Sequence, residues 1–288
     1  MDEELKSHIG EYLGIRIGRC TPLSGGDISS AFLLETATER FFCKMHSGQD
    51  AFAMFQAEKE GLEAIARTDT IKTPQIVFCG DLKEVAFLLL EFITTKSPSP
   101  KDMWRLGEQL AALHKRKQDT FGWANSNFIG SLKQSNHRES EWSVFFVKER
   151  LLPQLQLAVD RKMLSEKEMP GLAHMIQVLE NACNKVTASL LHGDLWNGNY
   201  LISEAGQPYL IDPAVYCGHN EVDLAMSRLF GGFSQQFYDA YETIFKPSPG
   251  AEVRQDLYQL YYLLVHLNLF GRSYYPSVVK LLHRYFPT

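Results

Sequence analysis

The 288-residue chain lacks the features that mark a secreted or membrane-bound protein. Its five cysteines are an odd number, widely spread and without a Cys-x-x-Cys pair, which argues against a disulfide framework and a zinc site. The acidic N-terminus, Met1–Glu4, is followed by no apolar stretch of the kind found in a secretory signal, and no apolar run reaches the length of a membrane span. We therefore expect a cytoplasmic protein that has no membrane partner.

A surplus of basic charge is also absent. Lysines and arginines number 29 against 34 aspartates and glutamates, for a formal net charge of -5. A protein that binds the phosphate backbone of a nucleic acid needs a positive surplus, so we expect no nucleic-acid partner. Apolar residues are plentiful instead, at 45% of the chain with 12% aromatic, which is enough for a sizeable core in one large domain or two lobes.

The first part of the chain, residues 1–93, has the pattern of a β-sheet with one helix. Residues 50–67 carry apolar side chains at helical spacing behind an aspartate in capping position. On either side of this helix lie β-rich runs separated by turn-forming residues. The predicted strands span 15–23, 29–35, 39–46, 75–81 and 85–91.

A polar, proline-containing stretch, Thr94–Pro100, separates this part from the remainder, and we predict lobes of residues 1–93 and 94–288 on either side of it. The second lobe is mostly helical by its apolar spacing. Its predicted helices fall within 142–159, 172–186 and 233–245, and its short predicted strands at 189–191, 200–203 and 208–211. The fold class is therefore α+β, with a small antiparallel-sheet lobe that has one main helix and a larger helical lobe.

Polar residues at the ends of the short strands could carry phosphoryl transfer. Asp194 lies in a loop after an apolar strand, and Asn199 follows five residues later, so one loop can present a carboxylate to an acceptor hydroxyl and an amide oxygen to a metal. Asp212 ends the next apolar run and offers a second metal ligand. We take Asp194 as the candidate catalytic base, and Asn199 and Asp212 as candidate ligands of Mg²⁺.

Four residues of the first lobe could position a nucleotide. Lys44 lies in an apolar strand, where alternation would hold its ammonium in a cleft, and Glu58 on the following helix is its candidate partner. Gly25 and Gly26 lie between the first two strands, where glycines allow backbone N–H groups to approach phosphates.

Taken singly, each of these residues has a simpler explanation. A Gly-Gly pair between strands is usually a hairpin turn, a strand lysine is usually a solvated edge residue, and an Asp or Asn in a loop usually caps a turn. Their order along the chain favours function. A glycine-containing turn, strand lysine, helix glutamate, linker, Asp-x4-Asn loop and strand-end aspartate follow one another in the order that a kinase fold requires.

Several stretches carry a resemblance to a known family. The loop His192–Asn199 resembles the catalytic loop of aminoglycoside phosphotransferases, and the chain as a whole more closely resembles the fructosamine kinase (ketosamine kinase) family. The matching segments are Leu191–Asn199, Asp212–Met226, Leu229–Phe233, Gly25–Ser29, Lys44, Phe55–Glu58 and His266–Gly271. The resemblance implies a two-lobed protein-kinase-like fold, ATP held by Lys44 with Glu58, and the same roles for Asp194, Asn199 and Asp212.

The resemblance also implies residues that contact the ligands. It places Trp196 beside the sugar, where the indole face suits C–H groups and a nearby ammonium, although a core anchor of the loop is an equal alternative. Tyr216, His266 and Asn268 could line the acceptor pocket, and a core position suits His266 and Asn268 equally. The hinge that meets adenine through its backbone is expected at Glu91, Phe92 and Ile93.

Two further residues near the loop have expected structural roles. Asp223 heads an amphipathic segment and is expected to bind the backbone of the catalytic loop, and His192 is expected to be a packed, hydrogen-bonded residue and not an acid or base. The Asp-Phe-Gly and Ala-Pro-Glu motifs of protein kinases are absent, so we expect no activation loop controlled by phosphorylation.

The expected reaction is Mg²⁺- and ATP-dependent phosphorylation of a sugar hydroxyl on a fructosamine or ribulosamine, small or protein-bound, by a monomer or weak homodimer. Phosphorylation at O3 is implied by the resemblance alone. One alternative is a kinase of this fold that acts on an aminoglycoside, choline or an amino alcohol, but the acidic residues of the late segments are too scattered to favour it. Another is an inactive kinase fold used as a binding module, which the intact polar set opposes.

Overall fold

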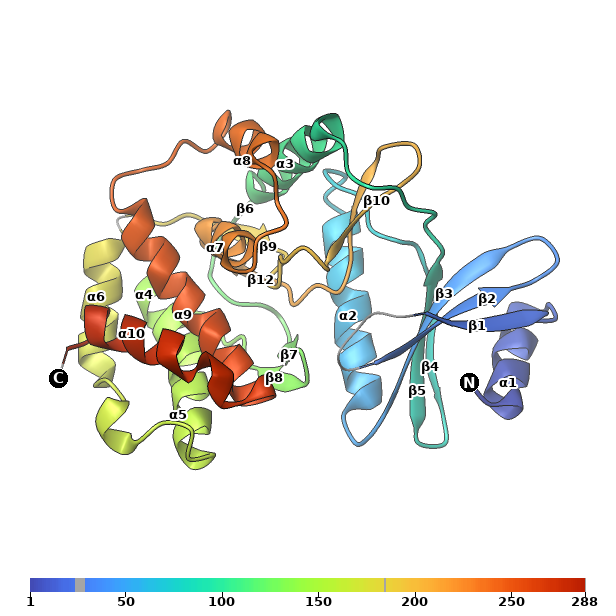
Figure 1. Cartoon of the computed structure of the whole chain (residues 1–288), viewed down its shortest axis with the longest axis horizontal. Coiled ribbons are helices and arrows are strands. Elements are labelled where there is room, and N and C mark those ends of the chain that lie inside the picture. The colour runs from blue at the N-terminus through green and yellow to red at the C-terminus, as the bar shows by residue number, and fades with distance from the viewer. Residues whose placement is uncertain (24–28, 184, 288) are drawn as a thin grey trace.

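The N-terminal lobe is built on a five-stranded antiparallel sheet with the strand order β1-β2-β3-β5-β4 (Figure 1). In this computed structural model, residues 1–23, 29–183 and 185–287 are described. The strands are β1 (Arg19–Leu23), β2 (Ser30–Glu35), β3 (Arg40–Ser47), β4 (Ile76–Leu82) and β5 (Val85–Glu91). The five predicted strands are confirmed, but β1 begins later than expected because Gly14 in the left-handed region and the bond from Ile15 N to Gly10 O close a preceding helix.

Alternation along β3 and β5 gives the sheet two apolar faces. Phe41 and Cys43 pack with Phe87 and Leu89 on one face, and Phe42 packs with Leu88 and Leu90 on the other. Lys44 shares the face of Phe42 because side chains two residues apart point the same way. The lysine is thereby turned toward the helix that covers this face.

Helix α2 (Ala51–Ala66) covers the face of Lys44 and stands between the sheet and the helical lobe (Figure 1). Phe55 and Leu62 pack against β5, whereas Ala64 and Ile65 belong to a core shared with the second lobe. The helix predicted over 50–67 is confirmed. Its contacts with both lobes explain how a side chain on α2 can meet groups that come from both.

Helix α1 (Glu3–Leu13) covers the other face and was not predicted from the sequence. Asp2 caps it by accepting a hydrogen bond from Leu5 N, and Leu5 and Ile9, one turn apart, are buried on the sheet. The helix is short and mostly polar, so its apolar side is narrow. The cap, the Leu5–Ile9 spacing and Gly14 were the signals that could have located it.

The lobes are joined by the segment between Glu91 and Pro100, and the boundary predicted after residue 93 falls within it. Helix α3 (Pro100–His114) starts at a capping box, in which Ser99 and Asp102 bind each other's backbone N–H groups. The helices that follow are α4 (Trp142–Phe146), α5 (Leu152–Asp160), α6 (Leu172–Ala182), α7 (Glu221–Leu229), α8 (Gln235–Glu242), α9 (Ala251–Phe270) and α10 (Tyr275–Tyr285). The helices predicted within 142–159, 172–186 and 233–245 are thus confirmed.

Short strands hold the predicted polar loops. They are β9 (Ala188–Leu191), β10 (Tyr200–Ile202) and β11 (Pro208–Leu210), which were predicted, and β6 (Lys117–Gln118), β7 (Asn127–Ile129), β8 (Leu132–Gln134) and β12 (Tyr216–Gly218), which were not. Strands β12, β9 and β6 form one small sheet, and β10 pairs with β11. The loop between β9 and β10 therefore ends close to the turn that follows β11.

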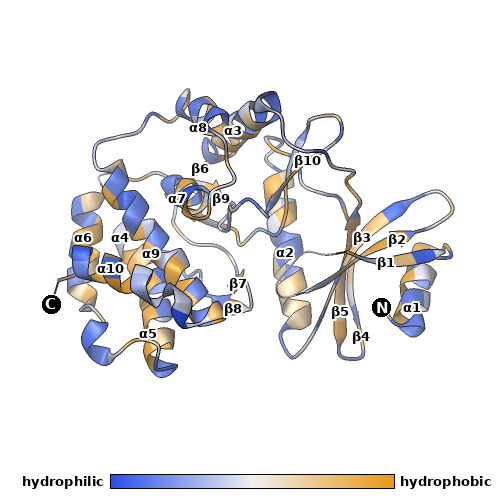
Figure 2. Cartoon of the chain, viewed as in Figure 1, coloured by the Kyte–Doolittle hydropathy of each residue, from blue (hydrophilic) through white to orange (hydrophobic). Residues whose placement is uncertain are grey.

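Apolar side chains are concentrated on the sheet strands, whereas the outer helices carry both apolar and polar residues (Figure 2). Helix α9 crosses the centre of the second lobe and is buried along most of its length. Among the described residues, no helix combines the length and the apolar character needed to cross a membrane.

Candidate active site

Lys44 and Glu58 form the ion pair that the sequence suggested. Lys44 Nζ donates to Glu58 Oε2 at 2.7 Å, and the two side chains are 13% and 12% exposed. Burial alone would lower the pKa of Lys44, but the carboxylates of Asp212 and Glu58 outweigh it and raise this pKa above its ordinary value. The ammonium is therefore fixed in its charged form where strand and helix meet.

Asp212 joins the pair from the second lobe. Lys44 Nζ also donates to Asp212 Oδ1 at 2.8 Å. Asp212 has a φ of 53°, in the left-handed region that residues with a Cβ adopt only uncommonly. Burial tends to raise the pKa of Asp212, but the charge of Lys44 lowers it below the ordinary value, so this carboxylate stays ionised.

The ammonium of Lys44 thus lies between two acidic side chains, Glu58 and Asp212. Burial, more than any neighbour, raises the pKa of Glu58, and the other oxygen of Glu58, Oε1, is buried without a hydrogen-bond partner in the described part of the chain. Two carboxylates thus share one ammonium in this arrangement. A cation brought to Asp212 would relieve the competition between them.

Asp194 and Asn199 face each other across the loop between β9 and β10. Asn199 Nδ2 donates to the backbone oxygen of Asp194 at 2.8 Å and to its Oδ2 at 3.2 Å. In the described part of the chain, Asp194 Oδ1 and Asn199 Oδ1 have no hydrogen-bond partner and are open. Burial raises the pKa of Asp194 to about 7, with a further contribution from the charge of Asp212. A carboxylate with a pKa near neutrality is suited to accept a proton.

A buried set of hydrogen bonds holds the start of this loop. Asp223 accepts from His192 N at 2.8 Å and from Gly193 N at 2.9 Å, and His114 Nε2 lies 3.1 Å from its Oδ2. His192 is buried, with Nε2 2.8 Å from the carbonyl oxygen of Ile211. The expected structural roles of Asp223 and His192 are confirmed.

His114 and Tyr262 belong to this set and were missed by the sequence reasoning. His114 Nδ1 lies 2.8 Å from Tyr241 Oη, and Tyr262 Oη donates to Gly193 O at 2.8 Å. Both come from helices distant in sequence, α3 and α9, so no local pattern joins them to the loop. Gly193 itself has a φ of 84°, and a Cβ there would lie 2.1 Å from Ala214 O, so only glycine fits.

Trp196 lies at the surface, 36% exposed, with its indole over Gly198. It is therefore not a buried anchor of the loop. The segment Gly231–Gly232 abuts the same loop, since a Cβ on Gly232 would lie 2.3 Å from the Cβ of Asn197. Trp196 is two residues from Asp194 on the same loop, and its indole is exposed.

The three other residues expected near an acceptor lie in different surroundings. His266 is half-buried, with its ring centroid 4.6 Å from that of Phe230 and 5.4 Å from that of Phe270. Tyr216 is fully buried beneath the guanidinium of Arg150, and Asn268 is 2% exposed. Asn268 links α9 to α5, because its side chain donates hydrogen bonds to Gln154. The structure places the side chains of Tyr216 and Asn268 in the core, away from a surface that an acceptor could reach.

The predicted hinge follows directly after β5. Glu91 accepts a hydrogen bond from Gln75 N through its side chain, and the ring of Phe92 lies under the guanidinium of Arg40. The backbone groups of Phe92 and Ile93 make no hydrogen bond within the described residues. Gly25 and Gly26 lie outside the described residues.

The donor set suits a magnesium ion. Mg²⁺ binds through one or two protein oxygens and completes its shell with phosphates and water. Asp212 supplies an ionised carboxylate, and Asn199 supplies an amide oxygen that no described residue bonds. Among the described residues there is no group of three His, Cys, Asp or Glu that could hold a metal by protein ligands alone.

The fold and these side chains together define a phosphotransferase of the protein-kinase-like class: a sheet lysine paired with a helix glutamate, an Asp-x4-Asn loop and a strand-end aspartate. The sequence model described as fructosamine kinase matches residues 1–287. The chain belongs to the fructosamine kinase family.

Relatives and solved structures agree with this family. The chain is 38% identical over 270 residues to a probable ketoamine kinase of Enterococcus faecium, covering 93% of this chain and 95% of that protein. It is 36% identical to the chloroplastic protein-ribulosamine 3-kinase of Arabidopsis thaliana, with 94% and 83% covered.

Among solved structures, a putative fructosamine-3-kinase from Haemophilus somnus superimposes with a TM-score of 0.87 at 26% identity, covering 97% and 96% of the two chains. An aminoglycoside phosphotransferase in ternary complex with AMP-PNP and hygromycin B has the same fold, with a TM-score of 0.63 at 15% identity and 98% of both chains covered.

Proposed function

We propose that this protein transfers the γ-phosphoryl group of ATP to the O3 hydroxyl of a ketosamine, a fructosamine or ribulosamine. The observation that carries the proposal is the meeting of Lys44, Glu58 and Asp212 from two lobes beside a loop in which Asp194 has an open carboxylate oxygen. Family membership supports the ketosamine class. The O3 position rests on the name of the ribulosamine 3-kinase relative.

The residues of the chain take separate parts in the reaction. Lys44, held by Glu58, binds the nucleotide phosphates and offsets charge that develops on them. Asp194 Oδ1 accepts the proton of the sugar hydroxyl as its oxygen attacks phosphorus, while Oδ2 stays bonded to Asn199. Phe92 and Ile93 meet adenine with their unengaged backbone groups, and Glu91 fixes the strand end before them.

Asp212 and Asn199 are the residues that hold Mg²⁺. The ion, when bound, neutralises charge on the phosphate oxygens. In the arrangement described here Asp212 bonds Lys44, so binding of the metal with the nucleotide requires Asp212 to be shared between ammonium and cation. Gly25 and Gly26 are proposed to approach the phosphates on the basis of the sequence alone.

Trp196 is proposed to contact the sugar-amine. Its exposed indole lies two residues from Asp194, within reach of a substrate whose hydroxyl meets that carboxylate. An ammonium near the indole face gains cation–π attraction, and a ketosamine carries such an amine. His266 packs with Phe230 and lies one helical turn from Tyr262, which bonds Gly193 of the catalytic loop. Of the two α9 residues expected at the acceptor, His266 is therefore better placed than the buried Asn268.

The protein is proposed to act in the reducing cytoplasm as a monomer or weak homodimer. All five cysteines are free thiols in the structure, in keeping with a reducing compartment. The substrate is a ketosamine carried by a small amine or by a protein lysine.

The test is MgATP consumption by the purified chain with a panel of fructosamine and ribulosamine conjugates of lysine, hygromycin B and choline. Turnover with the two ketosamines and little with the others is expected, and NMR of the product should place phosphorus on O3. Turnover confined to hygromycin B or choline would contradict the substrate class. No consumption with any acceptor would favour the inactive binding module.

A further inference from the structure

A second pocket lies behind the catalytic loop, away from the Lys44–Glu58 pair. Its volume is ≈ 370 Å³, within the range of small-molecule sites. It is bounded by the end of α3, the start of β9, the segment before α7 and the segment after α8. The lining residues include Lys115, Lys117, Lys185, His219, Asn220 and Ser189.

The charge of this pocket has one sign. Lys115, Lys117 and Lys185 line it, and no aspartate or glutamate does. Within the described residues none of the three lysines forms an ion pair or a hydrogen bond through its side chain, although each is exposed. Three unpaired ammonium groups around one hollow are unexpected in a chain with a net charge of -5, and they create a positive local potential.

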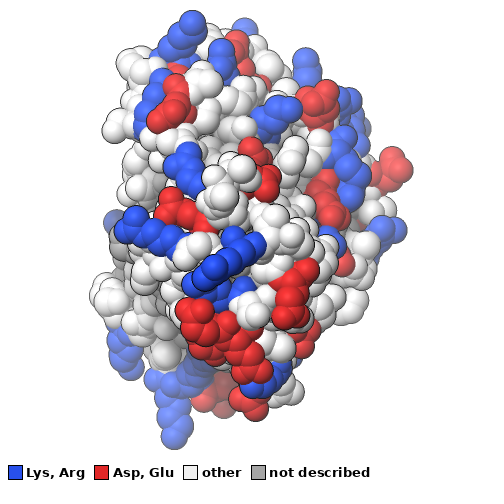
Figure 3. Space-filling view, turned by 90° about the vertical axis from the view of Figure 1, so that its right-hand side faces the viewer, with Lys and Arg blue, Asp and Glu red and all other residues white. Residues whose placement is uncertain are grey.

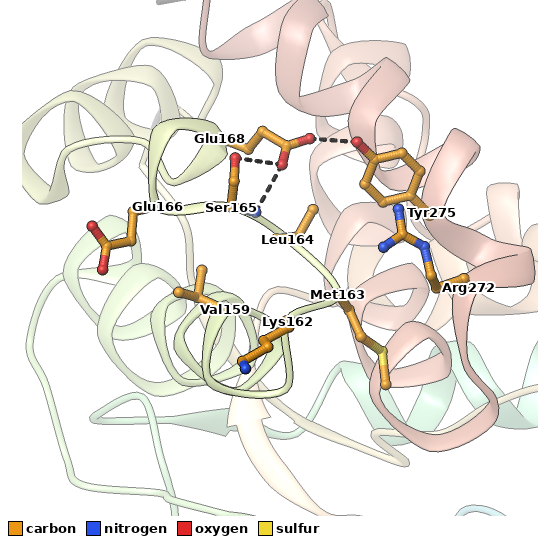
Figure 4. A pocket seen from close by; sticks show the side chains of 9 residues that line it. All are labelled: Val159, Lys162, Met163, Leu164, Ser165, Glu166, Glu168, Arg272 and Tyr275. Atoms are coloured by element: carbon orange, nitrogen blue, oxygen red, sulfur yellow. Dashed lines mark hydrogen bonds between the residues drawn. The ribbon is translucent and has the colours of Figure 1, made fainter.

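Two other surfaces of the molecule do not share this bias. On the face formed by the N-terminal lobe, positive and negative side chains are interspersed (Figure 3). A hollow of ≈ 460 Å³ between α5 and α10 has Lys162 and Arg272 together with Glu166 and Glu168, and Glu168 is already bonded to Ser165 and Tyr275 (Figure 4). Because its charges are mixed, that hollow favours neither an anionic nor a cationic ligand.

His219 adds an uncharged donor to the lysine pocket, defined by Lys115, Lys117, Lys185 and His219. Its Nδ1 lies 2.7 Å from Tyr258 Oη, which accepts from Trp142 Nε1 at 3.0 Å and lies 3.2 Å from Cys183 Sγ. The single phenolic proton best serves the short contact to Nδ1, so His219 Nδ1 is the acceptor. The ring proton then resides on Nε2, which has no partner among the described residues.

The floor of the lysine pocket is rigid. Asn220 Nδ2 donates to Tyr241 Oη at 2.7 Å, Tyr241 Oη bonds His114, and His114 bonds Asp223, which holds the catalytic loop. Ser189 Oγ donates to His114 O at 2.6 Å. Polar groups fixed in this way keep the shape of the hollow without a ligand, which lowers the cost of binding one.

We propose that the lysine pocket is a binding site for a small phosphate-bearing anion. Lysine is a common phosphate binder as a point charge, and an imidazole N–H provides a directional donor beside the three ammonium groups. The concave shape and the limited volume suit one phosphate group with a small substituent rather than the extended backbone of a nucleic acid. Inorganic phosphate and a sugar phosphate share this chemistry.

The experiment measures binding of inorganic phosphate and, separately, of fructose 6-phosphate to the full chain by titration calorimetry. Saturating MgADP occupies the nucleotide site, and sodium chloride keeps the ionic strength constant. The pocket variant is Lys115→Gln, Lys117→Gln and Lys185→Gln combined. The matched control changes three exposed lysines elsewhere, Lys101→Gln, Lys167→Gln and Lys280→Gln, and loses the same charge.

At least one phosphate compound should bind the wild-type chain and the control variant, and the pocket variant should bind it at least tenfold more weakly. Binding of inorganic phosphate alone would identify the free ion as the ligand, and binding of both compounds would identify a phosphate group in general. Lys117→Glu alone changes the charge of the pocket by two and provides a second variant, which should also bind more weakly than the control, although by less than the triple variant. Equal affinities of the pocket and control variants, or no binding to the wild-type chain, would overturn the proposal.

Discussion

The catalytic loop has two parts with opposite surroundings. His192 and Gly193 are held on the inner side, where Asp223 accepts both of their backbone N–H groups and no atom is left for a substrate. Asp194, Trp196 and Asn199 form the outer part, which has an open carboxylate oxygen, an exposed indole and a free amide oxygen. The pKa of Asp223 is lowered below its ordinary value, because hydrogen bonds and histidine charges outweigh its burial, whereas the pKa of Asp194 is raised.

The contrast shows that two carboxylates bonded to the same loop take different roles because their hydrogen-bond partners differ. A carboxylate that accepts several N–H groups is stabilised as an ion and serves as a structural anchor. A carboxylate with few donors is destabilised as an ion and can take up a proton. The inner part should therefore contribute to stability and the outer part to turnover.

The largest expected effect is on turnover, from Asp194→Asn. The amide cannot accept the proton of the hydroxyl, so kcat should fall by about 10³-fold, the middle of the range for general base catalysis. MgATP affinity should stay within about threefold, because Lys44, Asn199 and Asp212 remain. Thermal unfolding should occur at the same or a higher temperature, since the variant removes a carboxylate that burial destabilises.

The measurement is steady-state kinetics with a ketosamine, together with a thermal melt. Asp119→Asn, which changes an exposed aspartate on another surface, is the matched control and should leave kcat unchanged. A variant that keeps more than about a tenth of the wild-type kcat would show that Asp194 is not the base.

The second prediction concerns the inner part. Asp223→Ala leaves two backbone N–H groups and His114 without their acceptor, and removal of one member of a buried charged set costs about 3–5 kcal/mol. The free energy of unfolding in urea should fall by that amount. Asp102→Ala removes a carboxylate that is similarly buried, but this one caps α3 and pairs with the partly exposed Lys96, so its cost should be smaller, about 1–2 kcal/mol.

Equal losses in the two variants would contradict the role of Asp223 as an anchor of the loop. Asp194→Asn supplies the other side of the comparison, because it should change kcat strongly and the free energy of unfolding little. The reverse pattern, a stable Asp223→Ala and an unstable Asp194→Asn, would invert the assignment of the two parts.

The sequence predicted the outer part of the site better than the inner part. Lys44, Glu58, Asp194, Asn199 and Asp212 were identified because phosphoryl transfer needs these residue types in this order, and the structure brings them together. His114 was not identified, because its partner Asp223 lies more than a hundred residues away and only the tertiary fold brings the end of α3 to it. Charge and burial, not spacing, define that contact.

The strands and helices were likewise predicted where the signal was local in the sequence. The five strands and α2 were predicted because alternation and helical spacing are local properties, whereas α1 was missed because its apolar side is narrow. For Asn268 the sequence left a core position and a place in the acceptor pocket equally open, and the structure gives the core position, whereas the burial of Tyr216 was not predicted. Helix α9 is enclosed on most sides, so its sequence lacks the polar stripe that would have shown which side faces solvent.

The third prediction uses the raised pKa of Asp194. The base must be ionised, so kcat/KM should rise with pH through about 7 and level off above it. The raised pKa also makes stability depend on pH. Asp194 keeps its proton to higher pH in the folded chain than in the unfolded chain, where its pKa is the ordinary 3.8. Stability from this group is present below about pH 4 and is lost as the pH rises toward 7.

Urea unfolding measured over a series of pH values tests the stability prediction. In Asp194→Asn the fall in the free energy of unfolding between about pH 4 and 7 that is due to Asp194 should disappear, while the pH dependence due to other groups remains. A rise of kcat/KM centred below about pH 5 would mean that the carboxylate is not shifted in the working enzyme.

The smallest expected effect belongs to Trp196→Ala. The indole gains about 1 kcal/mol from an ammonium and sugar C–H groups, so its loss should raise KM for a ketosamine about five- to tenfold while kcat changes little. The exposed indole of Trp104, on α3, is the matched control, and Trp104→Ala should leave KM unchanged. Because Trp196 is already at the surface, its removal should also leave the free energy of unfolding within about 1 kcal/mol of the wild-type value. A large loss of stability with an unchanged KM would move Trp196 from the outer part of the loop to the inner one.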